Sequence, residues 1–317
     1  MFLCRIAGNI RVYILQLVSL EASLLLCHLI LQTVNNYFKT FLIHTFTVEI
    51  SHQFRDSDTV VVFVDNQYLK KILSVLPECP KIRKIIVLGD YDRNIRASVE
   101  IFPCNTIDKY PAKMPAPVEI DPAEDVFWLP YSSGTTGLPK GVMITHKNYL
   151  DHFKVVTFHH LQVLFTNTQI SPSDYTISFM PIYHAMGYAY FVGDLVKGAT
   201  TIVMKKYSLE KVLYFVEKYK LNLLRAAPAV AQQLAKNPIA KKYDLSSIVA
   251  IGTGGSKLDE GTMKLILKQL PTVQLVYQGY GMTEAVAGLS LSRGKITDPL
   301  NCAGAPLPGV DIKVLLI

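Results

Sequence analysis

The chain has 317 residues, half of them hydrophobic, and a formal net charge of +7. That length allows one large core or two modest ones. Lysines and arginines are spread along the chain, which argues against a nucleic-acid-binding array. The five cysteines are widely spaced and form no C-x-x-C pair. They exclude a disulfide framework or zinc knuckle as the simplest reading and favour an intracellular protein with reduced thiols.

The first 47 residues are atypical. Between Arg11 and Lys39 the sequence has no basic residue and a single acid, Glu21. The apolar stretch at 12–31 has the length of a membrane-spanning helix, so membrane contact is expected there alone. A buried helix, and sequence that does not belong to the fold, are the alternatives. A signal peptide is disfavoured because no clear small-residue cleavage site follows.

From residue 48 onward, helix and strand patterns alternate. The expected strands are 60–64, 84–88, 126–131, 141–145, 175–180, 200–204, 221–226, 247–251, 273–277 and 311–317. The expected helices are 66–76, 146–165, 188–197, 209–216, 230–236 and 259–270. A proline-rich linker is expected at 103–123. The alternation predicts an α/β fold with doubly wound sheets, whose ligands bind beyond the carboxyl ends of the strands.

The first candidate site is the segment from Tyr131 to His146, with the sequence YSSGTTGLPKGVMITH. It combines glycines, hydroxyls and a cation: Ser132, Ser133, Gly134, Thr135, Thr136, Gly137 and Lys140. Several donors around one positive charge suit a polyphosphate. The loop is not a Walker A loop, because Lys140 follows a proline and precedes a glycine. A flexible linker is the alternative, which the flanking apolar strands disfavour.

Three further segments follow expected strands. Tyr183 and His184 precede Gly187; a lone histidine is more often structural, but this position favours a pocket. The segment 252–256, GTGGS, is either a tight turn or a place where a ligand approaches the backbone. The segment 277–284, YQGYGMTE, offers Tyr280 for stacking on a base and Glu284 for Mg²⁺.

The string SSGTTGLPKGV closely resembles the phosphate loop of the adenylate-forming superfamily, and QGYGMTE resembles its adenine and magnesium segment. That superfamily includes acyl-CoA synthetases, aryl-CoA ligases such as 4-coumarate-CoA ligase, luciferases and peptide-synthesis adenylation domains. The resemblance covers residues 48–317. It implies the large N-terminal domain of such an enzyme, truncated at both ends, and without the mobile C-terminal domain.

The resemblance also implies ATP, Mg²⁺ and CoA as ligands and a carboxylic acid as substrate. The implied catalytic residues are Lys140, His184, Thr283 and Glu284. The implied nucleotide contacts are Ser132, Ser133, Gly134, Thr135, Thr136, Gly137, Lys140, Gly254, Gly255, Ser256, Gln278, Gly279, Tyr280, Gly281, Met282 and Thr283. The implied contacts to the acid are Tyr183, His184, Gly187 and Gly254, and Glu284 is the implied Mg²⁺ ligand. Lys257 stands where the superfamily often has proline.

The expected chemistry is activation of the acid as an acyl-adenylate, followed by thioester formation with CoA. The superfamily's ribose-binding Thr-Gly-Asp, hinge arginine and C-terminal catalytic lysine are missing, so we expect impaired activity in this chain. The alternatives are a non-catalytic nucleotide- or acyl-binding remnant, a luciferase-like or carrier-protein-dependent enzyme, and a membrane-anchored interaction protein. The expected location is the peroxisome or the cytoplasm.

Overall fold

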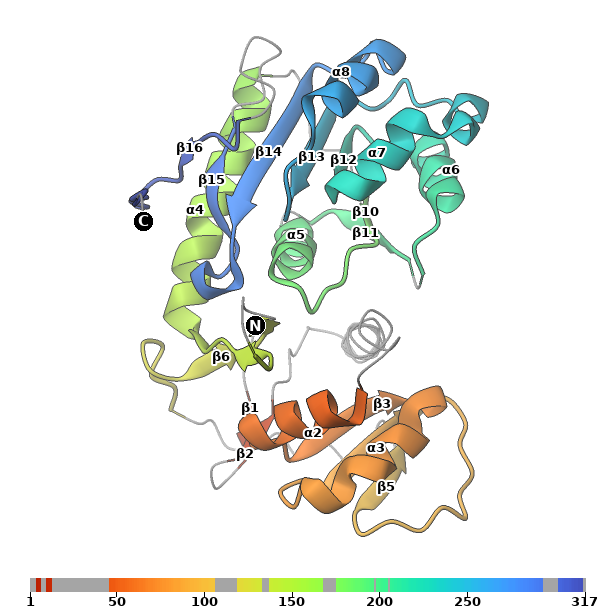
Figure 1. Cartoon of the computed structure of the whole chain (residues 1–317), viewed down its shortest axis with the longest axis vertical. Coiled ribbons are helices and arrows are strands. Elements are labelled where there is room, and N and C mark those ends of the chain that lie inside the picture. Colours follow the sequence, from red (N-terminus) through yellow and green to blue (C-terminus); the bar gives the residue numbers. More distant parts are fainter. Residues whose placement is uncertain are drawn as a thin grey trace. The chain divides into compact units, whose positions relative to one another are not determined.

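The computed structural model describes residues 4–6, 10–12, 46–105, 119–132, 137–167, 175–196, 198–204, 206–292 and 302–315. Its contacts divide the chain into two units, drawn together in Figure 1 and described here one at a time. The first comprises residues 1–147 with 181–183, and the second residues 148–180 with 184–317. Strands β1 (Cys4–Ile6) and β2 (Ile10–Val12) pair antiparallel. Most of the apolar stretch expected at 12–31 lies outside the described residues.

The first unit is built on a parallel sheet of strands β3 (Val61–Asp65), β4 (Lys84–Leu88) and β5 (Glu100–Pro103). Helices α2 (Phe46–Asp56) and α3 (Leu69–Val75) accompany it, with short 3-10 turns, η1 and η2, at Asn66–Tyr68 and Leu76–Glu78. The expected core spacing in α3 is confirmed, since Leu69 and Ile72 are fully buried. Strand β5 was not predicted from sequence, because it is short and ends in proline, as edge strands can.

Two antiparallel ribbons follow in the same unit. Strand β6 (Val126–Trp128) pairs with β9 (Ile144–Thr145), and β7 (Tyr131–Ser132) pairs with β8 (Lys140–Gly141). The single strand expected at 141–145 is therefore wrong. The break lies where the Val142 N–H bonds Pro130 O at 2.9 Å and the Met143 side chain is exposed. Helix α4 (His146–Asn167) starts where the sequence predicts.

The second unit contains a five-stranded sheet in the order β12 (Leu223–Ala226), β13 (Ala250–Gly254), β14 (Leu275–Gly281), β15 (Gly288–Leu291), β16 (Ala305–Pro306). The first three strands are parallel, and the last two pairings are antiparallel. Strands β10 (Tyr175–Ser178) and β11 (Thr200–Val203) form a parallel pair. This mixture of parallel strands with crossing helices is an α/β architecture.

Four helices of the second unit follow those strands: α5 (Ala185–Val196), α6 (Leu209–Tyr219), α7 (Pro228–Lys236) and α8 (Glu260–Gln269). Figure 1 shows α7 and α8 side by side against the strands β12, β13 and β14. Their core includes the fully buried side chains of Leu213, Leu224, Ile251 and Ile266. Asp259 caps α8 as predicted, because its Oδ1 accepts the Thr262 N–H at 2.8 Å.

Three element boundaries differ from the sequence predictions in ways that affect the site. Helix α5 starts directly after His184, three residues before the expected 188. Strands β13 and β14 continue through Gly254 and Gly281, so the segments expected as loops begin inside the sheet. The strand expected at 311–317 is wrong for 311–315, which form no strand, and the Val314 side chain is 84% exposed. Apolar alternation alone does not make a strand where no neighbouring strand pairs with it.

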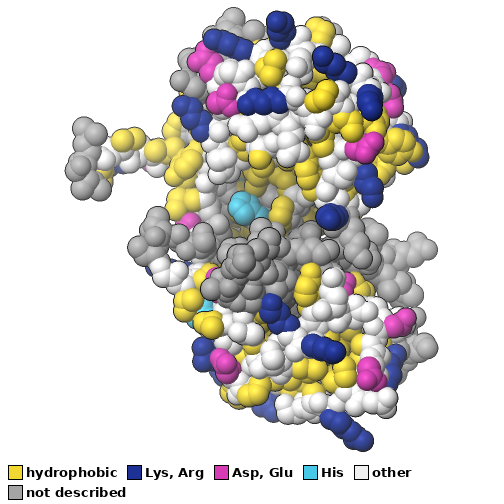
Figure 2. Space-filling view, turned by 45° about the vertical axis from the view of Figure 1, so that its right-hand side comes forward, with side chains coloured by type: hydrophobic (Ala, Val, Ile, Leu, Met, Phe, Trp, Pro, Cys, Tyr) yellow, Lys and Arg dark blue, Asp and Glu magenta, His cyan; other side chains and the backbone are white. Residues whose placement is uncertain are grey.

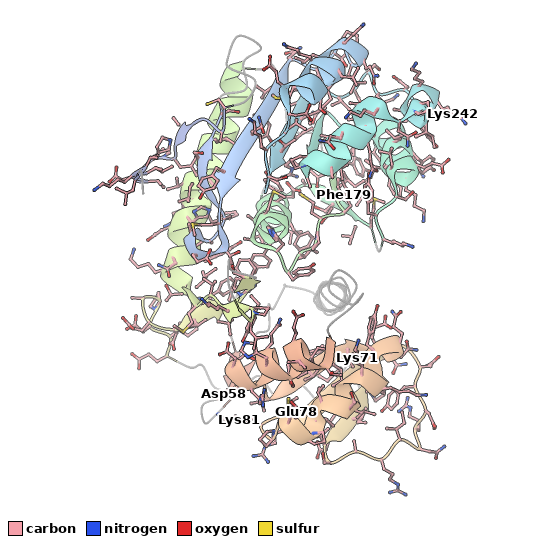
Figure 3. The ribbon with its side chains drawn as sticks, viewed as in Figure 1. Asp58, Lys71, Glu78, Lys81, Phe179 and Lys242 are labelled. Carbon is pink, nitrogen blue, oxygen red and sulfur yellow. The ribbon has the colours of Figure 1, made fainter. Side chains whose placement is uncertain are left out.

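Charged side chains lie scattered over both units. In the space-filling view, dark-blue and magenta side chains are interspersed with neutral ones on the visible face (Figure 2). Figure 3 shows one pair, Asp58 and Lys81, at the surface of the first unit, where Lys81 Nζ lies 2.6 Å from Asp58 Oδ1. Among the described residues, no helix is long and apolar enough to cross a membrane.

Candidate nucleotide and acid site

The phosphate loop is held at both ends by a two-residue ribbon in the first unit. Tyr131 lies opposite Gly141, and Ser132 lies opposite Lys140, in antiparallel register. The connection between the two strands therefore starts at one candidate residue and ends at another. Gly137 has a φ of +82°, which favours glycine, and the Lys140 side chain is exposed. Ser133, Gly134, Thr135 and Thr136 lie outside the described residues.

Helix α2 braces this loop from the same unit. His52 Nε2 lies 2.9 Å from Pro139 O, and a carbonyl oxygen can only accept, so Nε2 carries the proton. The Tyr131 hydroxyl lies 2.7 Å from Asp56 Oδ2 and 3.2 Å from Gln53 O. Burial, together with the Asp56 carboxylate, raises the pKa of Tyr131, so its hydroxyl stays protonated and donates. The sequence analysis missed this brace, because nothing local links α2 to a loop so distant in sequence.

In the second unit, His184 caps the start of α5. The Met186 N–H donates to His184 Nδ1 at 3.3 Å. A neutral imidazole that accepts at Nδ1 carries its proton on Nε2, which can then donate to a ligand oxygen. Burial lowers the pKa of His184, so the neutral ring predominates near pH 7. The geometry thus favours a hydrogen bond over an ionic contact with a carboxylate.

The carboxyl end of β13 lies against α5. A Cβ added at Gly254 would come 3.1 Å from Met186 Sδ, so this strand end and the first turn of α5 are closely packed. Gly255 has a φ of +83° and directs the chain into the loop before α8. Two candidate acid contacts, His184 and Gly254, are therefore both next to Met186. Tyr183 belongs to the first unit, and Gly187 is buried within α5.

The segment QGYGMTE runs from β14 into the turn before β15. The ring of Tyr280 is 51% exposed, as stacking on a base requires. Gly281 cannot carry a side chain, because a Cβ there would meet Ala287 O at 1.9 Å. Thr283 and Glu284 open a short 3-10 turn, η5 (Thr283–Ala285). The strand thus ends in an aromatic ring, a hydroxyl and a carboxylate in close succession.

Gln278 has a structural role in this geometry. Its side chain is buried, and Oε1 accepts the Leu258 N–H at 2.8 Å. Its backbone N–H donates to Ser292 Oγ, and its carbonyl accepts the Ser292 N–H, each at 2.8 Å. Gln278 therefore ties the loop before α8 to β14 and β15. We revise its expected part in nucleotide binding accordingly, since its side chain faces the core.

The described residues offer Mg²⁺ one exposed carboxylate, Glu284. They contain no cluster of three or more His, Cys, Asp or Glu side chains that could hold a metal by themselves. This fits Mg²⁺ bound through one carboxylate and nucleotide phosphates, because the ion keeps several waters and seldom needs a protein cage. Glu284 would hold the ion, and the ion would neutralise phosphate charge.

A two-unit α/β chain with a lysine-bearing Ser/Thr/Gly loop and an aromatic–hydroxyl–carboxylate strand end defines the N-terminal region of an adenylate-forming enzyme. The family described as AMP-binding enzyme matches residues 44–316, and the chain belongs to this family. Its homologues include acyl-CoA synthetases, 4-coumarate-CoA ligases and luciferases.

Individual relatives support the assignment. Acyl-CoA synthetase 7 of Caenorhabditis elegans is 32% identical over 272 residues, covering 84% of this chain and 48% of that protein. Luciferin 4-monooxygenase of Nipponoluciola cruciata is 30% identical, covering 77% of this chain and 44% of that protein. The luciferase-like enzyme of the mealworm Zophobas morio superposes with a TM-score of 0.68 at 26% identity, covering 84% of this chain and 59% of that one. The chain thus spans about half the length of these curated relatives.

Proposed function

We propose that this chain supplies the nucleotide- and acid-binding part of an AMP-forming acid–thiol ligase. A carboxylate oxygen of the substrate attacks the α-phosphorus of ATP, the bond to pyrophosphate breaks, and an acyl-adenylate forms. The thiol of CoA then replaces AMP to give the thioester. The single observation that carries the proposal is the strand end of β14, where an exposed Tyr280 is followed by Thr283 and Glu284 in one short turn.

The residues act by position and charge. Lys140 and the loop hydroxyls hold the leaving pyrophosphate, and Tyr280 stacks on adenine. Thr283 donates to the α-phosphate, whose charge grows in the transition state. Mg²⁺ on Glu284 neutralises phosphate charge. The neutral His184 donates from Nε2 to the acid and orients it for attack.

Magnesium, the fatty or aromatic nature of the acid, and a peroxisomal or cytoplasmic location belong to this proposal. The Tyr-His segment at 183–184 is supported by two kinds of relative, acyl-CoA synthetases and 4-coumarate-CoA ligases, which differ in acid. We propose a medium-sized hydrophobic or aromatic acid, because α5 next to Gly254 is rich in apolar and aromatic side chains.

The test is ATP–pyrophosphate exchange by the 317-residue chain with a panel of fatty and aryl acids, alongside calorimetric titration with ATP and Mg²⁺. We expect micromolar to millimolar ATP binding that needs Mg²⁺ and falls in Glu284→Gln. Acid-dependent exchange would establish adenylation, and AMP release on adding CoA would establish ligation. ATP binding without exchange would favour the non-catalytic alternative. A folded chain that binds no ATP would refute the proposal.

A further inference from the structure

His152 of α4 and Gly288 of β15 are joined by a hydrogen bond between residues 136 positions apart. The Gly288 N–H donates to His152 Nε2, with 3.2 Å between the nitrogens. Both residues belong to the second unit. A ring nitrogen can accept only when it carries no proton, so this bond requires a neutral His152 protonated at Nδ1. Burial lowers the pKa of His152, which favours that form.

Gly288 follows the turn that carries Thr283 and Glu284. That turn is closed by the Met282 N–H, which donates to Ala287 O at 2.9 Å. The backbone between β14 and β15 is irregular, with a shift in register at Tyr280 and Gly281. The start of β15 is therefore the point at which the turn is anchored to the rest of the unit.

Val286 adds strain to the same turn. Its φ is +70° and its ψ is −50°, and the Ala287 N–H donates to Ala285 O at 2.8 Å across it. A β-branched residue rarely adopts this conformation, which persists only where the surrounding structure holds it. The Val286 side chain is buried, which is one restraint. The bond from Gly288 to His152 is a second restraint, placed immediately after the strained segment.

We propose that His152 is a positioning residue: by accepting the Gly288 N–H it holds the strained turn from Met282 to Ala287, and so presents Thr283 and Glu284 to the nucleotide. His152 acts through the backbone and does not contact the ligand. The inference rests on the proposed function for the roles of Thr283 and Glu284. The contact with Gly288 stands without that function.

Two variants separate the acceptor from the shape of the side chain. His152→Phe keeps a flat ring and removes the acceptor, whereas His152→Gln removes the ring and offers Oε1 as an acceptor in a similar place. Lys154→Leu is the matched control, because Lys154 is exposed on the same helix. Amide hydrogen exchange of the 317-residue chain, without ligand, is measured at Gly288 and across 279–292.

We expect exchange at Gly288 to rise about tenfold in His152→Phe and to remain within about threefold of wild type in His152→Gln and Lys154→Leu. Unchanged protection in a folded His152→Phe would overturn the inference, and so would equal loss in the Phe and Gln variants. If His152→Phe does not fold, ¹⁵N spectra of the wild-type ring decide. A proton on Nδ1 supports the bond, and a proton on Nε2 overturns it.

Calorimetric titration with ATP and Mg²⁺ tests the consequence for the site. We expect the Kd for ATP to rise about tenfold in His152→Phe and to change by less than about threefold in His152→Gln. Faster exchange at Gly288 with an unchanged Kd would overturn the positioning role. If wild type binds no ATP, the proposed function fails, and the exchange result still decides whether His152 holds the turn.

Discussion

Arg225 of β12 donates a hydrogen bond to Asp194 of α5, and the side chains of this ion pair are only 6% and 5% exposed. The Arg225 guanidinium also lies over the ring of Tyr190, 4.8 Å from its centroid. Burial works against the charge of Arg225, but Asp194 outweighs it and raises the Arg225 pKa. The pair ties the helix that begins after His184 to the parallel sheet that leads to the site.

Breaking this pair on one side should be costly. We expect Arg225→Met to lower the free energy of unfolding by about 3–5 kcal/mol, because Asp194 is left charged and buried. The double variant Arg225→Met, Asp194→Leu should recover most of that loss. Lys220→Met, which breaks the exposed pair with Asp244, is the control and should change stability little. Urea denaturation measures all three, and equal losses in the single and double variants would contradict the explanation.

Gly252 is required by the packing of Tyr277. A Cβ at this position would come 2.3 Å from both Cζ and the hydroxyl oxygen of Tyr277, which is fully buried. We expect Gly252→Ala to destabilise the chain by about 3 kcal/mol, since the ring has no room to move. Gly193→Ala is the matched control, because its Cβ would meet only Phe153 Cε2, at 3.9 Å.

The control has its own expected sign. Gly193 lies inside α5, where alanine should stabilise by about 0.5–1 kcal/mol. Thermal unfolding compares the two variants directly. Similar melting temperatures for Gly252→Ala and Gly193→Ala would show that Tyr277 moves aside.

His184 should act on the acid and not on ATP. His184→Asn can keep an acceptor for the Met186 N–H but loses the Nε2 donor. We expect the KM for the acid in pyrophosphate exchange to rise about tenfold, the worth of one hydrogen bond, with the KM for ATP nearly unchanged. A parallel rise in both constants would assign His184 a structural role only.

The α2 brace predicts a remote effect on phosphate binding. His52→Leu removes the donor to Pro139 O at the exit of the phosphate loop. We expect ATP affinity to fall about threefold to tenfold, because the loop must then be ordered on binding. His52→Gln, which can still donate, should retain affinity. Calorimetry provides the measurement, and wild-type affinity in His52→Leu would show that the loop needs no brace.

Stability should fall when the pH is lowered below about 6.5. Burial lowers the pKa values of His146, His152 and His184 from their ordinary 6.5. Between the folded pKa values and 6.5 the unfolded chain binds more protons, so the free energy of unfolding rises with pH across that window and is lost on acidification. Urea denaturation at pH 7.5, 6.5 and 5.5 measures the slope. His152→Gln should make it shallower, and a flat profile in wild type would contradict the expectation.

The sequence by itself determined the family, the alternation of helices and strands, and the residues that carry chemistry. Those features are local: the loop at 131–146 and the segment at 277–284 are contiguous, and helical spacing in α3 and α6 is readable without neighbours. The sequence did not predict β5, and it placed the ends of β13 and β14 too early. Whether a backbone segment continues as a strand depends on its pairing with other strands.

Only the tertiary structure decided which residues hold the candidate site in shape. His52 reaches Pro139, Asp194 pairs with Arg225, and His152 accepts from Gly288, each across a long stretch of chain. It also turned Gln278 into the core and assigned the proton of His184 to Nε2. Hydrogen bonds and ion pairs between distant segments arise from the packing of elements, and a sequence pattern contains no record of which distant side chain will be the partner.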